Sequence, residues 1–518
     1  MSTELLVGRR GSETWAALRE DGRIVELHVD PADDRAGVGR IYKARVSRVL
    51  PGIQSAFMEF GAERQAFLHA RDLLLPGEPP RPVAARALLH HSPGADGTDD
   101  DPAIGPGRGY GAGAGCDDRA GVDLPPIEDR LKVGRDLLVQ ISRESLGEKG
   151  PRATCYLSFP GHLLVLFPQL RHRGVSRRIE DPDERARLLE ILARIAGDDV
   201  GFVARTAALG AGESSLVADA HDLLATWSSV EERFEVARAP SVVHREPDLL
   251  LRMLRDTAPY APEQIIVDTL ARRDRVLEYL TRVQPVLKSR VELHEGREPL
   301  LEAYGVIREA EKAVRPKVWL KSGGYLVIQE TEALVSIDVN TGKFVGGRRA
   351  EETVLQTNIE AAHEIARQLR LRNLGGIVVM DFIDMELAES RDRLMAELSE
   401  ALRPDRTKTN VIGLGELGLV QLTRKRTRPG LRAMLTVPCP HCFGDGRVRS
   451  PETVAAEAVA EVRRLSAESG NAPLAVKVHP GNATATREAL DGLGGLDVHL
   501  HEEPGLRPDR FQVWVREP

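Results

Sequence analysis

The chain has 518 residues, of which 42% are hydrophobic, 29% charged and 4% aromatic, and its formal net charge is −7. This length predicts several domains with enough apolar residues to bury their cores, and the charge excludes a uniformly basic protein. Four cysteines in so long a chain exclude a disulfide framework, and no apolar run is long enough to span a membrane. The first residues lack the apolar core of a signal peptide, so we expect a cytoplasmic protein without a membrane span.

The N-terminal third predicts a small antiparallel barrel with an insertion. From Val38 to His69, short β-rich runs are broken by the turn at Pro51-Gly52, which is how such a barrel begins. Residues 76–126 are rich in Pro, Gly, Asp and Ala, a composition typical of a disordered segment. Strand patterns resume in RDLLVQIS and HLLVLFP. We therefore expect these runs to close the barrel beyond the insertion.

Helical periodicity dominates residues 182–195 and 261–283. After residue 451, the order of patterns is helix, strand, helix, strand. This order predicts a separate small α/β unit at the C-terminal end.

Two aspartates interrupt apolar strand patterns. VSIDVN contains Asp338 and IVVMDFIDM contains Asp381, and residues 350–376 between them have helical spacing with a glycine stop. A strand, helix, strand unit of this length is a crossover whose strands are parallel and often adjacent. We therefore predict that the two acids lie side by side at the carboxyl ends of their strands, where open α/β sheets bind ligands.

Two carboxylates so close either share a proton or bind a cation, and oxygen ligands without His or Cys suit Mg²⁺ or Mn²⁺. Asn340, two residues after Asp338, supplies a neutral oxygen or orients a water. Such a site is typical of a phosphodiester hydrolase. The alternative is that the acids cap the turn or pair with Lys343 or Arg348, while Asp384 reads as a turn or helix cap.

A cysteine pair suggests half of a zinc site. Cys439 and Cys442 have the C-x₂-C spacing, but a tetrahedral zinc needs four ligands. Cys116 lies in the insertion and Cys155 in a strand pattern, so two protomers each donating one pair would complete the site. His441 as a third ligand, or a redox or inert dithiol, remains the alternative.

Several local patterns suit nucleic acid. On the predicted barrel, aromatic residues alternate with charged ones: Phe57, Phe60 and Phe67 with Arg45, Arg48, Glu63 and Arg64. The aromatic rings offer stacking faces to bases, although some of them must belong to the core. The basic runs 171–178 and 423–430 suit a phosphate backbone or a solvated face. Arg205 and Thr206 end an apolar run, and their fork and hydroxyl suit a phosphate.

The run GLGELG at 413–418 satisfies the dinucleotide fingerprint G-x-G-x-x-G. A strand-like basic run follows where a helix is required, and no acid about twenty positions on would hold a ribose. These features argue against a nicotinamide-dependent enzyme.

Taken together, SIDVNTGKFVG, TNIEAAHEIARQLRLRNLGGIVVMDFIDM, LVQLTRKRTR and CPHCFGDG resemble the ribonuclease E/G family. ELLV, IYKARVSRVLPGIQSAFMEFGAERQAFLHA, SRRIED and ARTAALG share the resemblance, which covers nearly the whole chain outside the insertion. The small tail after the cysteines, without a long C-terminal extension, resembles the ribonuclease G branch more than the ribonuclease E branch. A ribonuclease E-type enzyme without its long scaffold is the alternative.

The resemblance implies a multidomain α/β and α+β architecture. Its parts would be an RNase-H-like subdomain (1–37 and 250–313), an OB-fold RNA-binding barrel (38–155, with the insertion at 76–126), a 5′-sensor domain (156–249), a DNase-I-like catalytic subdomain (314–435), a zinc link (436–446) and a small C-terminal α/β domain (447–518).

The resemblance also implies residue roles. A catalytic Mg²⁺ would be bound by Asp338 and Asp381 with Asn340 in support, and Zn²⁺ by Cys439 and Cys442 of two protomers. RNA would be gripped by Phe57, Phe67 and Lys149. A 5′-monophosphate pocket would be formed by Gly161, Val165, Arg205 and Thr206. Whether such homodimers pair into tetramers stays open.

The implied activity is endonucleolytic cleavage of single-stranded RNA in ribosomal RNA precursors and messenger RNA. Water would attack the phosphodiester, leave 5′-phosphate and 3′-hydroxyl ends, and act faster on RNA with a 5′-monophosphate. A non-catalytic RNA-binding protein is the competing hypothesis. Two departures from the family pattern are the insertion and Leu146, which stands where a basic RNA-contacting residue is expected.

Overall fold

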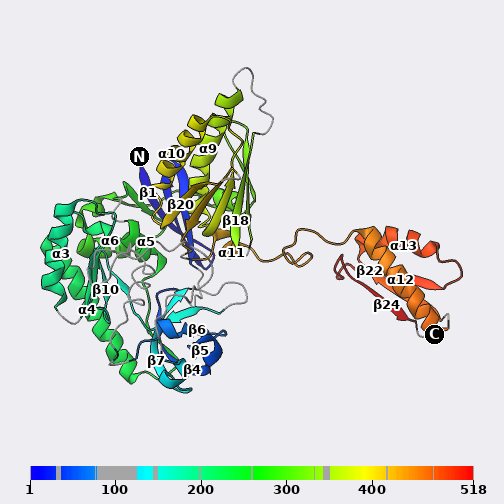
Figure 1. The fold of residues 1–518 in the computed structure, drawn as a ribbon, viewed down its shortest axis with the longest axis horizontal. Coiled ribbons are helices and arrows are strands. Elements are labelled where there is room, and N and C mark those ends of the chain that lie inside the picture. The colour runs from blue at the N-terminus through cyan, green and yellow to red at the C-terminus, as the bar shows by residue number, and fades with distance from the viewer. Residues whose placement is uncertain are drawn as a thin grey trace. The chain divides into compact units, whose positions relative to one another are not determined.

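The structure is a computed structural model that describes residues 2–30, 37–75, 78, 125–143, 150–197, 200–257, 261–331, 333–341, 350–415, 418–426, 428–470 and 472–516. The chain forms two compact units, Met1–Met434 and Leu435–Pro518 (Figure 1). Apart from residues 78, 125 and 126, the predicted disordered insertion lies outside the described residues. None of the described helices is long and apolar enough to cross a membrane.

A five-stranded sheet joins the N-terminal segment to a segment far along the chain. Its order is β15-β14-β1-β2-β3, with β1 (Thr3–Arg10), β2 (Glu13–Glu20), β3 (Arg23–Asp30), β14 (Gln264–Val267) and β15 (Val291–Leu293). Helices α5 (Leu249–Thr257) and α6 (Leu270–Val283) pack on it, and α7 (Leu300–Ala303) and α8 (Val306–Ala313) follow. The predicted helix 261–283 is wrong at its start, because β14 pairs in parallel with β1. That long-range pairing stabilises the β-branched run as a strand.

The barrel has five strands: β4 (Ile41–Leu50), β5 (Ser55–Glu59), β6 (Ala66–His69), β7 (Asp136–Arg143) and β8 (Arg152–Thr154). They follow the order β4-β5-β6-β8-β7, and β7 pairs back with β4, which closes the barrel. Helix α2 (Ile127–Arg130) and strand β13 (Ser241–His244), which pairs with β4, lie against it. The expected closing strand in RDLLVQIS is confirmed.

The run HLLVLFP, in contrast, is wrongly assigned to the barrel. It forms β10 (Leu164–Phe167) in a separate sheet of order β11-β12-β10-β9, with β9 (Phe159–Pro160), β11 (Arg173–Val175) and β12 (Gly201–Ala204). Every residue of β10 is buried, so the strand lacks the alternation of a barrel wall. Helices α3 (Pro182–Ala196) and α4 (Glu213–Val236) pack against this sheet. Helix α3 confirms the prediction over 182–195, and Asp181 caps its first turn.

The sheet that carries both aspartates has six strands in the order β16-β17-β18-β19-β21-β20. They are β16 (Lys317–Trp319), β17 (Tyr325–Glu330), β18 (Leu334–Asn340), β19 (Gly376–Asp381), β20 (Thr409–Leu414) and β21 (Leu419–Arg424). Helix α9 (Ala350–Leu371) joins β18 to β19, and it covers one face of the sheet together with α10 (Ala388–Leu402) (Figure 1). Strands β18 and β19 are parallel, which confirms the predicted crossover. Helix α11 (Leu431–Leu435) follows.

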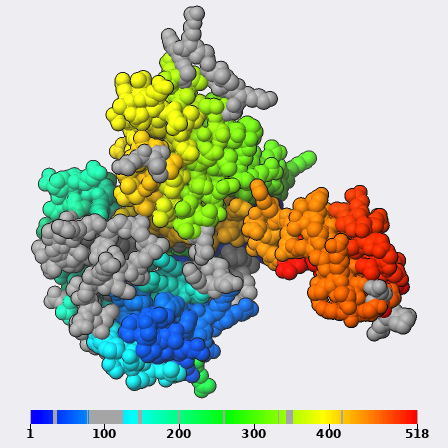
Figure 2. Space-filling model, turned by 45° about the vertical axis from the view of Figure 1, so that its right-hand side comes forward, coloured from blue at the N-terminus to red at the C-terminus, as the bar shows by residue number. Residues whose placement is uncertain are grey.

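The C-terminal unit contains α12 (Pro451–Ser469), β22 (Leu474–Val478), α13 (Ala483–Asp491), β23 (Val498–Glu502) and β24 (Phe511–Val515). Its sheet has the order β23-β22-β24, and α12 and α13 supply the other side of a core of its own. The space-filling view shows this end of the chain, orange to red, gathered into one body (Figure 2). The predicted helix, strand, helix, strand order is confirmed, and β24 is an additional strand.

Candidate functional site

Asp338 and Asp381 lie side by side on neighbouring parallel strands, where they are direct register partners. In β18, Val335, Ile337 and Val339 are buried against the helices, whereas Asp338 is exposed. Because successive side chains point to opposite faces of a sheet, the acids face away from α9 and α10. The predicted adjacency is confirmed, and we call these two residues the acidic pair.

Asn340 lies on the same face of β18 and contacts Asp338 directly. Its Nδ2 donates to Oδ2 of Asp338 over 2.8 Å. This bond fixes the direction of the Asp338 carboxylate and turns the amide oxygen of Asn340 elsewhere. On the neighbouring strand β17, Val327 lies opposite Asp338 and Tyr325 lies opposite Asn340.

The residues present fit a hard divalent cation. Among the described residues, neither member of the acidic pair forms an ion pair, so the two carboxyl groups lie side by side without a cationic partner. In the described part of the chain, no three His, Cys, Asp or Glu side chains lie close enough together to bind one metal ion. Two carboxylates suit Mg²⁺ or Mn²⁺, and such an ion would keep several waters. The alternative partners Lys343 and Arg348 lie outside the described residues.

On the barrel, Phe57 of β5 and Phe67 of β6 are register partners whose ring centroids are 6.0 Å apart, edge to face. Both are half-buried, so part of each ring reaches the surface. Phe60 instead packs against Tyr42 and is 2% exposed, so it belongs to the core. The predicted RNA-contacting Lys149, and Leu146, lie outside the described residues.

The structure brings together Gly161 and Arg205 of the predicted phosphate pocket. The Arg205 guanidinium donates to the carbonyl oxygen of Gly161 and, over 2.8 Å, to the carboxylate of Asp256. The turn at Gly161 is held by Asp219 of α4, which accepts three consecutive backbone N–H groups from His162, Leu163 and Leu164. A Cβ at Gly161 would lie 2.7 Å from the Asp219 carboxylate, so the turn requires glycine.

The other two predicted pocket residues differ in exposure. Thr206 is half-buried, and its hydroxyl lies 3.0 Å from that of Ser176. Val165 is fully buried in a cluster with Tyr156, Phe167 and Val203. Its side chain therefore lies in the core and does not line an accessible surface.

A chain of charged groups runs from this pocket to α9. The carbonyl oxygen of Asp256 accepts from Arg406 over 2.9 Å, and Arg406 also donates to Glu26 of β3 over 3.0 Å. The other oxygen of Glu26 accepts from Arg370 of α9 over 3.0 Å. We call Arg205, Asp256, Arg406, Glu26 and Arg370 the arginine relay. It ends on the helix that connects the two strands of the acidic pair.

Electrostatics keep the acids of the relay ionised. Burial by itself would raise the pKa of Asp256, but Arg255 and Arg205 hold it below its ordinary value. Burial likewise acts to raise the pKa of Glu26, but Arg406, His28 and Arg370 outweigh it and hold that pKa well below the usual range. Each acid is therefore charged at neutral pH and binds its arginines as an ion.

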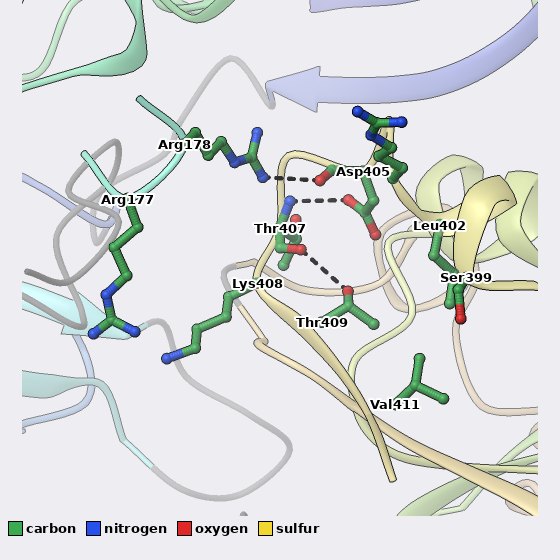
Figure 3. A pocket seen from close by; sticks show the side chains of 10 residues that line it. Arg177, Arg178, Ser399, Leu402, Asp405, Thr407, Lys408, Thr409 and Val411 are labelled. Carbon is green, nitrogen blue, oxygen red and sulfur yellow. Dashed lines mark hydrogen bonds between the residues drawn. The ribbon is translucent and has the colours of Figure 1, made fainter. Parts of the chain in front are cut away.

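A basic pocket of about 390 Å³ adjoins the relay, and Figure 3 shows Arg177 and Lys408 directed into it. Arg178 donates to the carbonyl oxygens of Asp405 and Arg406, each over 2.9 Å. The Asp405 carboxylate is buried in a pair with Arg424 at 2.7 Å, so its charge is balanced. The pocket therefore favours an anion. Both predicted basic runs contribute here, 171–178 at the pocket wall and 423–430 through a buried arginine.

The cysteine pair lies in a turn of the C-terminal unit. Cys439 is exposed and Cys442 is half-buried, and backbone N–H groups of Cys442 and His441 lower the pKa of the Cys439 thiol. No third described His, Cys, Asp or Glu joins them. Cys155 belongs to the other unit, where burial raises the pKa of its thiol to about 12 and keeps it protonated. Cys116 lies outside the described residues, and the shared zinc site stays a prediction.

The G-x-G-x-x-G run joins two antiparallel strands. Strand β20 ends at Leu414, the N–H of Gly415 donates to the carbonyl of Leu419 over 2.9 Å, and β21 follows. Because a strand stands where the dinucleotide fingerprint requires a helix, the expectation against a nicotinamide site holds.

Sequence patterns did not point to the supporting residues Asp219, Asp256 and Arg406. Each is one charged residue within a helix or loop that contains many, and its importance arises from contacts with distant segments. The available signal was weak, since Asp219 is one of several polar residues, with His221 and Asp222, in the first half of α4.

Known proteins resemble this chain over most of its length. A model described as "Ribonuclease E/G family" matches residues 158–427. Ribonuclease G of Escherichia coli (strain K12) is 39% identical over 520 residues, covering 99% of each chain. Ribonuclease G of Haemophilus influenzae is 40% identical over 90% of this chain and 88% of its own length. Ribonuclease E of Haemophilus influenzae is 33% identical over 88% of this chain and 45% of its own length.

Proposed function

This chain belongs to the ribonuclease E/G family, and on that premise we propose that it is a Mg²⁺-dependent endoribonuclease of the ribonuclease G type. The proposed substrate is single-stranded RNA in ribosomal RNA precursors and messenger RNA. The proposed cleavage leaves a 5′-phosphate and a 3′-hydroxyl.

The acidic pair carries this proposal. Asp338 and Asp381 are register partners on adjacent parallel strands, both are exposed, and neither has a cationic partner among the described residues. Two such carboxylates, with the Asn340 amide beside them, would hold one divalent cation. A Mg²⁺ ion held there would supply the positive charge needed to activate water as a nucleophile and to neutralise charge on the phosphate oxygens.

The side chains divide the work of the hydrolysis. Asp338 and Asp381 would bind the cation, and Asn340 holds the Asp338 carboxylate in one orientation through its 2.8 Å bond. Hydrolysis adds water across the bond between phosphorus and the 3′ oxygen. Phosphorus gains the hydroxyl as part of the new 5′-phosphate, and the leaving 3′ oxygen takes up a proton.

The second part of the proposal is stimulation by a 5′-monophosphate bound near Arg205 and Thr206. Arg205 offers a buried guanidinium bonded to the Gly161 carbonyl, and the next residue, Thr206, offers a half-buried hydroxyl beside Ser176. Phe57 and Phe67 on the barrel would stack against bases of the same RNA, with Lys149 contacting its backbone. Two protomers would share one zinc through Cys439 and Cys442.

Cleavage of one short single-stranded RNA with Mg²⁺ tests the site. We expect Asp338→Asn and Asp381→Asn to lower kcat/KM by at least about 100-fold, and Asn340→Ala by about 10- to 100-fold, because orienting partners of metal ligands matter less than the ligands. Asp384→Asn, an exposed acid just beyond β19, is the matched control and should retain activity.

The same assay run on RNA with a 5′-monophosphate, a 5′-triphosphate or a 5′-hydroxyl tests the second part. Faster cleavage of the monophosphate would support the pocket. Equal rates on all three ends would keep the nuclease and remove the role of Arg205 and Thr206. RNA binding without cleavage by the wild type would favour the non-catalytic RNA-binding protein.

A further inference from the structure

The face of the six-stranded sheet that carries the acidic pair also carries an aromatic and cationic cluster. Leu326 and Ile328 of β17 are buried against the helices, so Tyr325 and Val327 lie on the opposite face, with the acidic pair. Trp319 of β16 is the register partner of Tyr325, and Lys317 is the partner of Val327. Directly opposed residues of antiparallel strands share a face.

Two rows of side chains therefore cross this face from strand to strand. One row contains Lys317, Val327, Asp338 and Asp381. The other contains Trp319, Tyr325 and Asn340. Tyr325 is the direct neighbour of Asn340, which itself holds Asp338. Adjacent strands lie about 4.8 Å apart, so Trp319 is about 10 Å from Asn340.

The cluster is compact and accessible. The rings of Trp319 and Tyr325 meet edge to face at 5.4 Å. The Lys317 ammonium lies 4.1 Å from the centroid of Trp319 and 3.6 Å from that of Tyr325. Trp319 lies on β16, an edge strand of the sheet, and is 65% exposed. Only 4% of the residues in this chain are aromatic. A core or folding role leaves this exposure unexplained, because an indole used for packing is normally covered.

We propose that Trp319, Tyr325 and Lys317 form a nucleobase-stacking subsite next to the acidic pair. Its ligand is a base of the single-stranded RNA, carried by a nucleotide close to the phosphate that is cleaved. The exposed indole offers a flat π-surface that any base can use. Lys317, held over both rings, places one positive charge where the sugar-phosphate backbone passes.

The subsite gives the six-stranded sheet a way to position RNA that is independent of the barrel and of the 5′ end. Asp338 and Asp381 bear negative charge and bind the phosphate only through a cation, so they exert little hold on the bases themselves. A base stacked on Trp319 fixes the register of the strand and presents one phosphate to the acidic pair. This inference rests on the proposed function, since it presumes that RNA is the ligand of this face.

The test uses the full chain and one single-stranded RNA with a single cleavage site, in which positions around that site are replaced one at a time by an abasic nucleotide. Stacking of a base on an aromatic side chain contributes about 5- to 150-fold in affinity. We expect Trp319→Ala to lower kcat/KM on intact RNA within this range, and Trp319→Phe to retain most of the wild-type value.

One abasic position should reduce the kcat/KM of the wild type to that of Trp319→Ala on intact RNA. The same abasic RNA should not lower the kcat/KM of Trp319→Ala any further. This loss of additivity identifies the stacked base, and a general structural role of Trp319 would not produce it at one position alone. Trp514→Ala, which removes a 37% exposed tryptophan from the C-terminal unit, is the matched control and should cleave like the wild type.

Wild-type kcat/KM for Trp319→Ala would overturn the subsite, as would losses that multiply independently at every abasic position. Binding of the same RNAs to Asp338→Asn, with and without Trp319→Ala, separates this proposal from the nuclease. If the wild type does not cleave but Trp319→Ala weakens binding at one base position, the subsite stands and the hydrolytic function fails. If the wild type cleaves and binding is indifferent to Trp319, the subsite fails alone.

Discussion

His162 lies against Arg205 of the proposed phosphate pocket, and it makes the stability of the first unit depend on pH. Burial lowers the pKa of its imidazole to about 4, Arg205 acts in the same direction, and Nδ1 has no hydrogen-bond partner among the described residues. Between pH 4 and its ordinary pKa of about 6.5, the unfolded chain binds this proton and the folded chain does not. The free energy of unfolding therefore falls as the pH drops through this window, by about 2 kcal/mol from pH 6.5 to 5.

We expect His162→Gln to remove this contribution. Urea unfolding at pH 7 and pH 5 measures it, and the variant should lose less stability on acidification than the wild type. His221→Gln, at an exposed position of α4, serves as control and should follow the wild type. An identical pH response of wild type and His162→Gln would contradict the assignment.

At the residue scale, the sequence predicted those positions that follow from the periodicity of apolar residues. Asp338 breaks an alternating apolar strand and Asp381 ends another, so their adjacency followed from the crossover between them. The burial of Val165 could not be predicted, because an apolar residue in a strand pattern is equally compatible with a pocket wall and with a core. The hydrogen bond of Asn340 to Asp338 depends on a side-chain rotamer that no pattern specifies.

At the scale of elements, the arginine relay predicts coupling between the proposed phosphate pocket and α9. A phosphate bound by Arg205 would compete with Asp256 for the guanidinium, and Asp256 holds Arg406 through its carbonyl oxygen. We expect Arg406→Met to reduce the preference for 5′-monophosphate over 5′-hydroxyl RNA by about 10-fold. This value lies within the range of about 5- to 150-fold that is typical of coupling between sites. Arg406→Lys should restore part of the preference.

Arg252→Met is the control for this prediction. Arg252 also joins α5 to β3, through Asp30 at 2.6 Å, but it takes no part in the relay. Its loss should lower stability without changing the ratio of kcat/KM on the two RNAs. An unchanged ratio in Arg406→Met, with the wild type discriminating, would show that the relay is only structural.

Element types were predicted where local periodicity decides them and missed where distant pairing does. Helix α9 ends as the capping residues indicate, and α3 begins at its predicted proline. Strand β14 was predicted as helix because its partner β1 lies far away along the chain, near the N-terminus. Strand β10 was assigned to the barrel because a short buried run does not state which sheet it joins.

At the scale of the whole molecule, the cysteine pair predicts how protomers assemble. Cys439 and Cys442 would supply two of the four ligands of a tetrahedral zinc, and no other described His, Cys, Asp or Glu joins them. We expect about one zinc per two chains by metal analysis of the purified protein. Cys439→Ser should lose the zinc and shift the dimer towards monomer in sedimentation. A zinc-bound dimer of Cys439→Ser would contradict the shared site.

The division into a large N-terminal unit and a small C-terminal one followed from the change of pattern after residue 451. The way in which the barrel and the sheet of β9–β12 are inserted between the two halves of the first sheet could not be read from local patterns. Only the resemblance to a family implied it, because both halves look like ordinary strands and helices when taken alone.

The first sheet cannot be completed until late in the synthesis of the chain. Strand β1 is central, between β2 and β14, and the backbone of Arg9 is bonded to Asp268, 259 positions further along the chain. At about 5 to 20 residues per second, a ribosome needs roughly 13 to 50 s to produce that partner. The hairpins of β1 to β3 must wait through this interval with one edge unpaired, while the barrel emerges and folds. A nascent chain stalled before β14 is therefore the form most exposed to aggregation and to chaperone capture.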